Sequence, residues 1–146
     1  MRRADWFSWA REELVKLVEI PSVSGQERQI LVHLEKRARE LGLPVCRGPV
    51  SSSRWNLLIG NCSDPGLVFV AHVDTVNPVW EGAEDVRVRG NCIHGLGAVD
   101  DKGGIVACLL ALMLAREGGV PLEGLPVAVG LTVDEELNGT GSLALA

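Results

Sequence analysis

Two near-continuous apolar runs constrain the fold of this chain more than any other feature of its sequence. One run spans residues 66–71 and the other spans residues 125–133, and a shorter run occupies residues 55–59. Strands that are apolar at nearly every position are typical of sheets covered on both faces, where parallel strands prevail. The runs therefore predict strands of a central sheet that lies between layers of helices.

Helices are predicted before and between these runs. Residues 4–19 carry apolar side chains at helical spacing before Pro21, and a second helix runs to about Leu41, with Gly42 as the residue that ends it. A third, apolar helix spans residues 103–116, and a half-exposed strand is predicted at residues 86–89. Alternation of helices and strands predicts an α/β three-layer sandwich with a mostly parallel central sheet.

Length and composition exclude several classes of function. The chain has 146 residues, enough for one domain, and a formal net charge of −5. It has no basic face of the kind that binds nucleic acid, and no apolar run of the ~18 residues that a membrane span needs. The N-terminus lacks the apolar segment of a signal peptide. The four cysteines form no CxxC pair, so we expect reduced thiols and a cytoplasmic location.

A histidine and an aspartate follow the first long run, at positions 72 and 74. Residues two apart on a strand point the same way, so His72 could offer a ring nitrogen to a metal while Asp74 fixes the orientation of the ring. The alternative is a hydrogen-bonded histidine beside a turn aspartate. Taken alone, so short a motif favours that alternative.

The glycine-rich segment GLGAVDDKGG, at residues 95–104, places Asp100 and Asp101 at the start of the third predicted helix. A carboxylate there could bridge two cations, or it could cap the helix by accepting backbone N–H groups. Gly95 and Gly97 also have the spacing of half a dinucleotide-binding fingerprint. Asp100 stands where the third glycine of that fingerprint belongs, and its charge would repel a pyrophosphate.

Three consecutive carboxylates, Asp134-Glu135-Glu136, follow the last apolar run. They repel one another unless cations or solvent relieve the repulsion, so they indicate either a solvated acidic turn or a metal site with a general base. All three polar clusters follow predicted strands or precede a helix, where ligands bind in open α/β sheets. Together they favour a site of oxygen and imidazole ligands, which suits Zn²⁺, Mn²⁺ or Co²⁺.

Three motifs, in this order, resemble the signatures of the M20 metallopeptidases. They are HVDTV at residues 72–76, GLGAVDDKG at residues 95–103 and DEELNGTG at residues 134–141, and the loop IPSVSG at residues 20–25 also matches. The family includes acetylornithine deacetylase, succinyl-diaminopimelate desuccinylase, aminoacylase and tripeptidases. Leu96 departs from the pattern, because many members carry arginine there. Three motifs at suitable separations are highly specific, although each alone is not.

The resemblance implies a role for each of five residues. His72 would bind a first metal, Glu136 would bind a second, and Asp100 would bridge the two. Glu135 would be the general base, and Asp74 would orient His72. The two divalent metals, Zn²⁺ before Co²⁺ or Mn²⁺, would polarise the scissile carbonyl of an N-acyl amino acid or a short peptide. The family pattern also implies a cis peptide bond between Asp100 and the residue after it.

The family pattern continues beyond Ala146 with another carboxylate ligand, a late histidine ligand and a smaller domain for dimerisation and substrate binding. We therefore expect residues 1–146 to be the N-terminal portion of a catalytic domain whose full-length relatives are homodimeric. Each metal would have only two protein ligands, whereas catalytic zinc has at least three, so we expect little or no hydrolysis by this chain alone. The alternative is a non-catalytic metal- or partner-binding fragment, in which a complementary chain covers apolar edges around residues 127–133.

Overall fold

The computed structural model describes residues 3–79, 81–82, 85–122 and 125–146. The elements follow one another as α1 (Arg3–Glu19), α2 (Arg28–Glu40), β1 (Val45–Pro49), β2 (Trp55–Gly60), β3 (Leu67–His72), β4 (Arg87–Arg89), β5 (Cys92–His94), α3 (Lys102–Glu117), β6 (Val127–Thr132) and α4 (Thr140–Leu145). The three predicted helices and the strands of the three apolar runs are confirmed. Strand β1 was not predicted, because its glycine and proline interrupt any apolar run and are tolerated only at a sheet edge.

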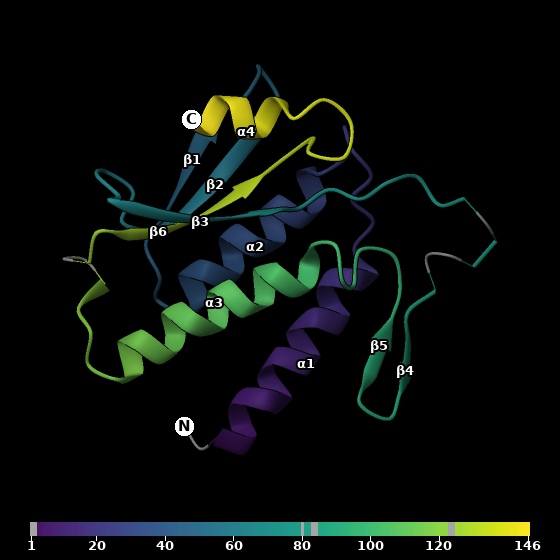
Figure 1. Cartoon of the computed structure of the whole chain (residues 1–146), viewed down its shortest axis with the longest axis horizontal. Coiled ribbons are helices and arrows are strands. Elements are labelled where there is room, and N and C mark those ends of the chain that lie inside the picture. The colour runs from purple at the N-terminus through teal and green to yellow at the C-terminus, as the bar shows by residue number, and fades with distance from the viewer. Residues whose placement is uncertain (1–2, 80, 83–84, 123–124) are drawn as a thin grey trace.

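The larger sheet has the strand order β1-β2-β6-β3 (Figure 1). Strands β3 and β6 are parallel and are connected through α3, but β2 is antiparallel to both β1 and β6. The α/β fold is confirmed, whereas the parallel arrangement holds for the β3–β6 pair alone. The antiparallel pairing of β1 with β2 follows from the turn at residues 50–54, where the Val50 N–H donates to the Arg54 carbonyl at 3.0 Å. So tight a turn can only join antiparallel strands.

Helices lie on both faces of this sheet. Val129 and Leu131 of β6 belong to the main hydrophobic core, on the side where α2 and α3 pack. A Cβ atom at Gly130, between them, would lie against the side chain of Leu145 in α4. Side chains alternate across a strand, so α4 covers the opposite face, as Figure 1 shows. The predicted three layers are therefore present, with α1 packed outside against α3.

Strand β3 lies at one edge of the sheet, and three of its apolar side chains are half exposed. The exposed fractions are 51% for Leu67, 52% for Phe69 and 55% for Val70. The expectation of an apolar edge around residues 127–133 is wrong, because β2 and β3 pair with both sides of β6. The expectation that each apolar run is covered on both faces also fails at β3.

The strand predicted at residues 86–89 lies outside the central sheet. It pairs as β4 with β5 in a separate antiparallel hairpin, which Figure 1 shows beside α1. Among the described parts of the chain, none of the helices combines the length and the apolar character that crossing a membrane requires.

Candidate metal centre

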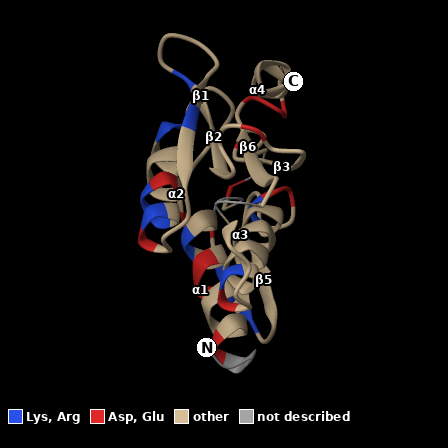
Figure 2. Ribbon diagram, turned by 90° about the vertical axis from the view of Figure 1, so that its left-hand side faces the viewer, with Lys and Arg blue, Asp and Glu red and all other residues tan. Residues whose placement is uncertain are grey.

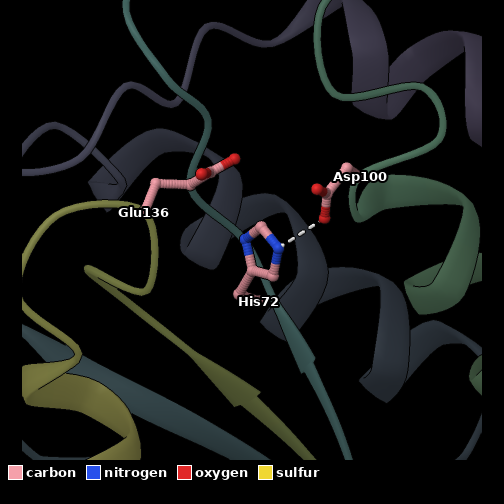
Figure 3. Close-up of side chains that lie close together, drawn as sticks. All are labelled: His72, Asp100 and Glu136. Atoms are coloured by element: carbon pink, nitrogen blue, oxygen red, sulfur yellow. Dashed lines mark hydrogen bonds and ion pairs between the residues drawn. The ribbon is translucent and has the colours of Figure 1, made fainter.

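Three side chains from separate segments converge where β3 ends (Figure 3). His72 is the last residue of β3, Asp100 lies just before α3, and Glu136 lies in the turn after β6. One ligand atom of each lies within 4.8 Å of the others. Strands β3 and β6 are parallel neighbours, so their carboxyl ends meet at the same edge of the sheet. An imidazole and two carboxylates are a suitable donor set for a divalent transition metal.

The two ring nitrogens of His72 face different groups. Nδ1 lies 3.0 Å from the backbone oxygen of Asp74, which can only accept, so we assign a proton to Nδ1. Nε2 lies 2.8 Å from Oδ1 of Asp100. Burial lowers the pKa of His72, but the hydrogen bond with Asp100 and the charges of Asp74 and Glu135 outweigh burial and raise it. A cation at Nε2 would replace the proton that these carboxylates favour.

Asp100 and Asp101 have different environments. The Asp100 side chain is 77% exposed and points toward His72, as Figure 3 shows. Asp101 takes the N-cap position of α3, yet its side chain makes no capping hydrogen bond. The Asp101 carboxylate therefore lies beside the first turn of α3 without a capping hydrogen bond, whereas the Asp100 carboxylate interacts with His72. The peptide bond between the two residues is cis, as the family resemblance implies.

Asp74 is fully buried and holds the acidic turn in place. Its carboxylate accepts the backbone N–H groups of Glu135 and Glu136, each at 3.0 Å, and the Ser24 hydroxyl at 2.6 Å. Its Oδ1 is 3.6 Å from Nδ1 of His72. The ring is therefore held more closely by the backbone oxygen of Asp74, and the carboxylate acts chiefly on the turn.

Asp134 differs from the two glutamates that follow it. Its φ of 62° turns the chain sharply after β6, which is rare for a residue other than glycine. Its buried carboxylate accepts the Thr140 hydroxyl at 2.6 Å and the Asn138 amide at 3.3 Å. The Thr140 hydrogen bond is the main cause that lowers the pKa of Asp134. Of the three consecutive acids, Asp134 shapes the turn, and Glu135 and Glu136 remain for chemistry.

The two glutamates lie beside the converging donors. Glu135 is half exposed, and its Oε2 lies 3.9 Å from Nε2 of His72. Burial raises the pKa of Glu136, and the negative charge of Asp100 adds to that effect. This repulsion between carboxylates is what a divalent cation would relieve, so the residues fit a metal.

Two buried polar side chains, of Asn56 and Glu27, hold the acidic turn in a way that the sequence motifs do not predict, and a third, of Lys102, lies at the start of α3. The Asn56 side chain accepts the Val133 N–H at 3.2 Å, and the Glu27 carboxylate accepts the Asp134 N–H at 3.1 Å. Lys102 is almost fully buried, and burial lowers its pKa to about 8. Asn56 left a signal in the sequence, because it is a polar residue inside an apolar run. Glu27 left none.

A cavity of about 650 Å³ opens beside the metal centre. Asp100 and Glu136 are among the residues that line it, and the β4–β5 hairpin contributes Arg87 and His94. A space of this size admits a small peptide or an acylated amino acid.

Comparisons with known proteins agree with this geometry. The family model "Peptidase family M20/M25/M40" matches residues 68–146. Two succinyl-diaminopimelate desuccinylases are similar in sequence. The one from Methylorubrum populi is 38% identical over 87% of this chain and 36% of its own length. The one from Gluconacetobacter diazotrophicus is 34% identical over 82% of this chain and 33% of its own length.

A solved structure, the aminopeptidase PepT from Bacillus cereus, has a TM-score of 0.77 and 25% identity to this chain. It is matched over 96% of this chain and 40% of its own length. The chain therefore spans about a third of the length of the curated relatives that it matches. The family match covers more than half of the chain and includes all three acidic or histidine clusters, so the chain belongs to peptidase family M20/M25/M40.

Proposed function

We propose that this chain contributes to the hydrolysis of amide or peptide bonds in small N-acyl amino acids or short peptides. The observation that supports the proposal is the convergence of His72, Asp100 and Glu136, whose ligand atoms lie within 4.8 Å of one another. The names of its relatives, which are desuccinylases and an aminopeptidase, agree with this class of substrate.

The donors suit two divalent cations, with Zn²⁺ favoured over Co²⁺ or Mn²⁺. His72 and Asp100 would hold the first, and Asp100 and Glu136 would hold the second. Bound metals would supply polarisation of the scissile carbonyl and a lowered pKa for the attacking water. The buried Asp74 would keep the backbone of Glu136 in place through its 3.0 Å hydrogen bond.

Glu135 is the residue that we propose as general base. Its carboxylate lies 3.9 Å from the imidazole of His72 and is half exposed. It would take a proton from the attacking water at a side-chain oxygen and deliver that proton to the leaving nitrogen. A Glu135→Gln variant keeps the size of the side chain and removes the base.

We propose that the 146-residue chain by itself binds metal weakly and hydrolyses little substrate. Under this proposal the described residues would give each metal two protein ligands, whereas catalytic zinc sites use at least three. The further ligands would come from polypeptide that corresponds to the part of the relatives that this chain does not span.

Titration with Co²⁺, followed by its visible absorption bands, tests the metal centre without relying on activity. We expect saturable bands that His72→Ala removes and that His94→Ala leaves unchanged. His94 is the matched control, because it lines the same cavity but is not one of the three converging donors. Equal binding of Co²⁺ by the His72→Ala and His94→Ala variants would contradict the proposal.

A second candidate function is partner binding through the edge of β3. The half-exposed Leu67, Phe69 and Val70 favour it, because an apolar strand edge readily pairs with another strand. The partner we propose is the part of a desuccinylase relative that this chain does not match. Adding that polypeptide should restore hydrolysis, and Phe69→Lys should weaken the effect. Full restoration by the Phe69→Lys variant would exclude this edge as the contact.

The proposed location is the cytoplasm. Cys46, Cys62, Cys92 and Cys108 are all free thiols in the structure, and unpaired thiols are typical of a reducing compartment. Fractionation of cells that produce the chain tests this, and recovery outside the cytoplasm would contradict it.

A further inference from the structure

A second cavity, of about 350 Å³, lies at the turn between β1 and β2. We call it the arginine cavity. Its walls come from Arg28, Arg47, Pro49, Ser51, Ser52, Ser53, Arg54 and Trp55. None of these residues belongs to the metal centre. Among the described residues that form its walls, none is acidic, so the cavity is lined by three guanidinium groups and three hydroxyls.

The positive groups of the arginine cavity surround one indole ring. The guanidinium carbons of Arg47 and Arg28 lie 4.3 and 5.5 Å from the centre of the Trp55 ring. Figure 2 shows that basic segments of β1, of the turn after it and of α2 gather on one side of the molecule. Two cations this close to a single ring repel each other, and an anion bound in the cavity beside them would reduce that repulsion.

The three arginines differ in how far they are neutralised. Arg47 is held by Glu35 at 2.6 Å, and Arg54 is held by Glu27. Within the ranges that the structure describes, Arg28 contacts the Trp55 ring but pairs with no carboxylate. Of the three guanidinium groups, that of Arg28 is therefore the one whose charge no described carboxylate balances.

Two walls of the cavity also carry hydrogen-bond donors that lack acceptors. Nε of Arg54 and Nε1 of Trp55 are buried, and neither has a hydrogen-bond partner in the described part of the chain. Trp55 itself is only 8% exposed. Both atoms are shielded from solvent, so a ligand in the cavity would bind the exposed groups of its walls instead, namely Arg28, Arg47 and the three serines.

We propose that the arginine cavity binds a phosphate-sized oxyanion, either free phosphate or the phosphate group of a small molecule. The planar fork of a guanidinium matches two oxygens of a phosphate, and hydroxyls donate to the remaining oxygens. A volume of about 350 Å³ accommodates such a group together with a small substituent. Neither the metal centre nor the hydrolysis proposed for it requires this site.

Calorimetric titration of the metal-free 146-residue chain with inorganic phosphate, at constant ionic strength, tests the proposal. We expect saturable binding at one site, weakened about tenfold or more by Arg28→Gln and by Arg47→Gln. The matched control is Arg39→Gln. Arg39 also binds Glu35 at 2.6 Å, but it does not line the cavity, so this variant should keep the affinity of the unmodified chain.

Arg28→Gln removes no ion pair, so its fold should be unchanged, and circular dichroism checks this. Displacement of phosphate by glycerol 2-phosphate would identify an esterified ligand, and failure to displace it would identify free phosphate; both support the site. Absence of saturable binding would overturn the proposal. An equal loss of affinity in Arg39→Gln and Arg47→Gln would also overturn it, because it would assign the effect to Glu35 rather than to the cavity.

Discussion

The carboxylate of Asp74 accepts the backbone N–H of Glu136 at 3.0 Å, and so connects the strand end that carries His72 to the turn that carries the glutamates. This hydrogen bond joins two residues that are 62 positions apart. Asp74, two residues after the histidine, therefore helps to position the turn after β6 as well as the end of β3.

Replacing Asp74 with Asn should destabilise the fold. The amide keeps one acceptor but places N–H donors toward a turn that already supplies two, and a buried group left unpaired costs about 1–3 kcal/mol. We expect a loss of about 2–4 kcal/mol in the free energy of unfolding, measured with urea. Asp64→Asn is the control, because Asp64 lies in an exposed turn. Equal stability of the two variants would show that Asp74 does not hold the acidic turn.

Glu13 should make stability depend on acidity. Burial raises its pKa, but the hydrogen bonds and charges of His33 and Arg37 outweigh burial, and the folded-state pKa lies below its usual value of 4.5. A carboxylate with a depressed pKa stabilises the fold above its unfolded-state pKa and loses that contribution as the pH falls through the folded-state pKa.

The urea midpoint should therefore fall as the pH drops below about 4.5, and it should fall less in Glu13→Gln. Glu12→Gln, at the exposed neighbouring position, should keep the pH dependence of the unmodified chain. Parallel curves for the Glu13→Gln variant and the unmodified chain would contradict the assignment.

Gly97 should tolerate alanine poorly. Its φ is +77°, and a Cβ there would lie 2.6 Å from Cγ2 of Thr75 and 3.3 Å from Cδ of Lys102. The left-handed backbone alone costs a side chain about 1–2 kcal/mol, and overpacking adds about 1–3 kcal/mol. Gly90 has a φ of +58° with nothing within 4 Å, so Gly90→Ala should show the backbone cost alone. Thermal unfolding of both variants measures the difference in stability. Equal losses of stability would mean that the side chains around residue 97 move to make room for the added methyl group.

A lysine at Phe69 should reduce self-association of the isolated chain. Phe69 is 52% exposed on the edge strand β3, and edge lysines oppose strand pairing between molecules. Light scattering against concentration measures the effect. Val79→Lys is the control, because Val79 is exposed but lies outside the strands. Equal improvement by both variants would attribute the change to net charge rather than to the strand edge.

The sequence predicts the elements better than their pairing. The helix that ends before Gly42 and the apolar strands at residues 67–72 and 127–132 follow directly from local patterns, because hydrophobic spacing and glycine conformations are local properties. The direction of β2 depends on the turn at residues 50–54, whose serines fit many kinds of loop. Which strand lies at the edge depends on long-range pairing that no local pattern encodes.

The sequence predicts the metal-binding side chains of the candidate site better than it predicts the residues that hold them in place. His72 ends a strand, Asp100 precedes a helix and Glu136 follows a strand, each in a recognisable motif. The parallel pairing of β3 with β6 brings His72 and Glu136 to the same edge of the sheet. The role of Asp74 as an acceptor for the acidic turn is a tertiary contact over 61 or 62 positions. Glu27 lies in a polar loop, where a buried glutamate looks the same as a solvated one.

The most direct test is a crystal structure of the chain soaked with Zn²⁺, read from the anomalous scattering of the metal. We predict one peak within coordination distance of Nε2 of His72 and a carboxylate oxygen of Asp100, and a second peak near the carboxylates of Asp100 and Glu136. A structure in which zinc binds only elsewhere, while these three side chains keep their places, would contradict the assignment of the metal centre.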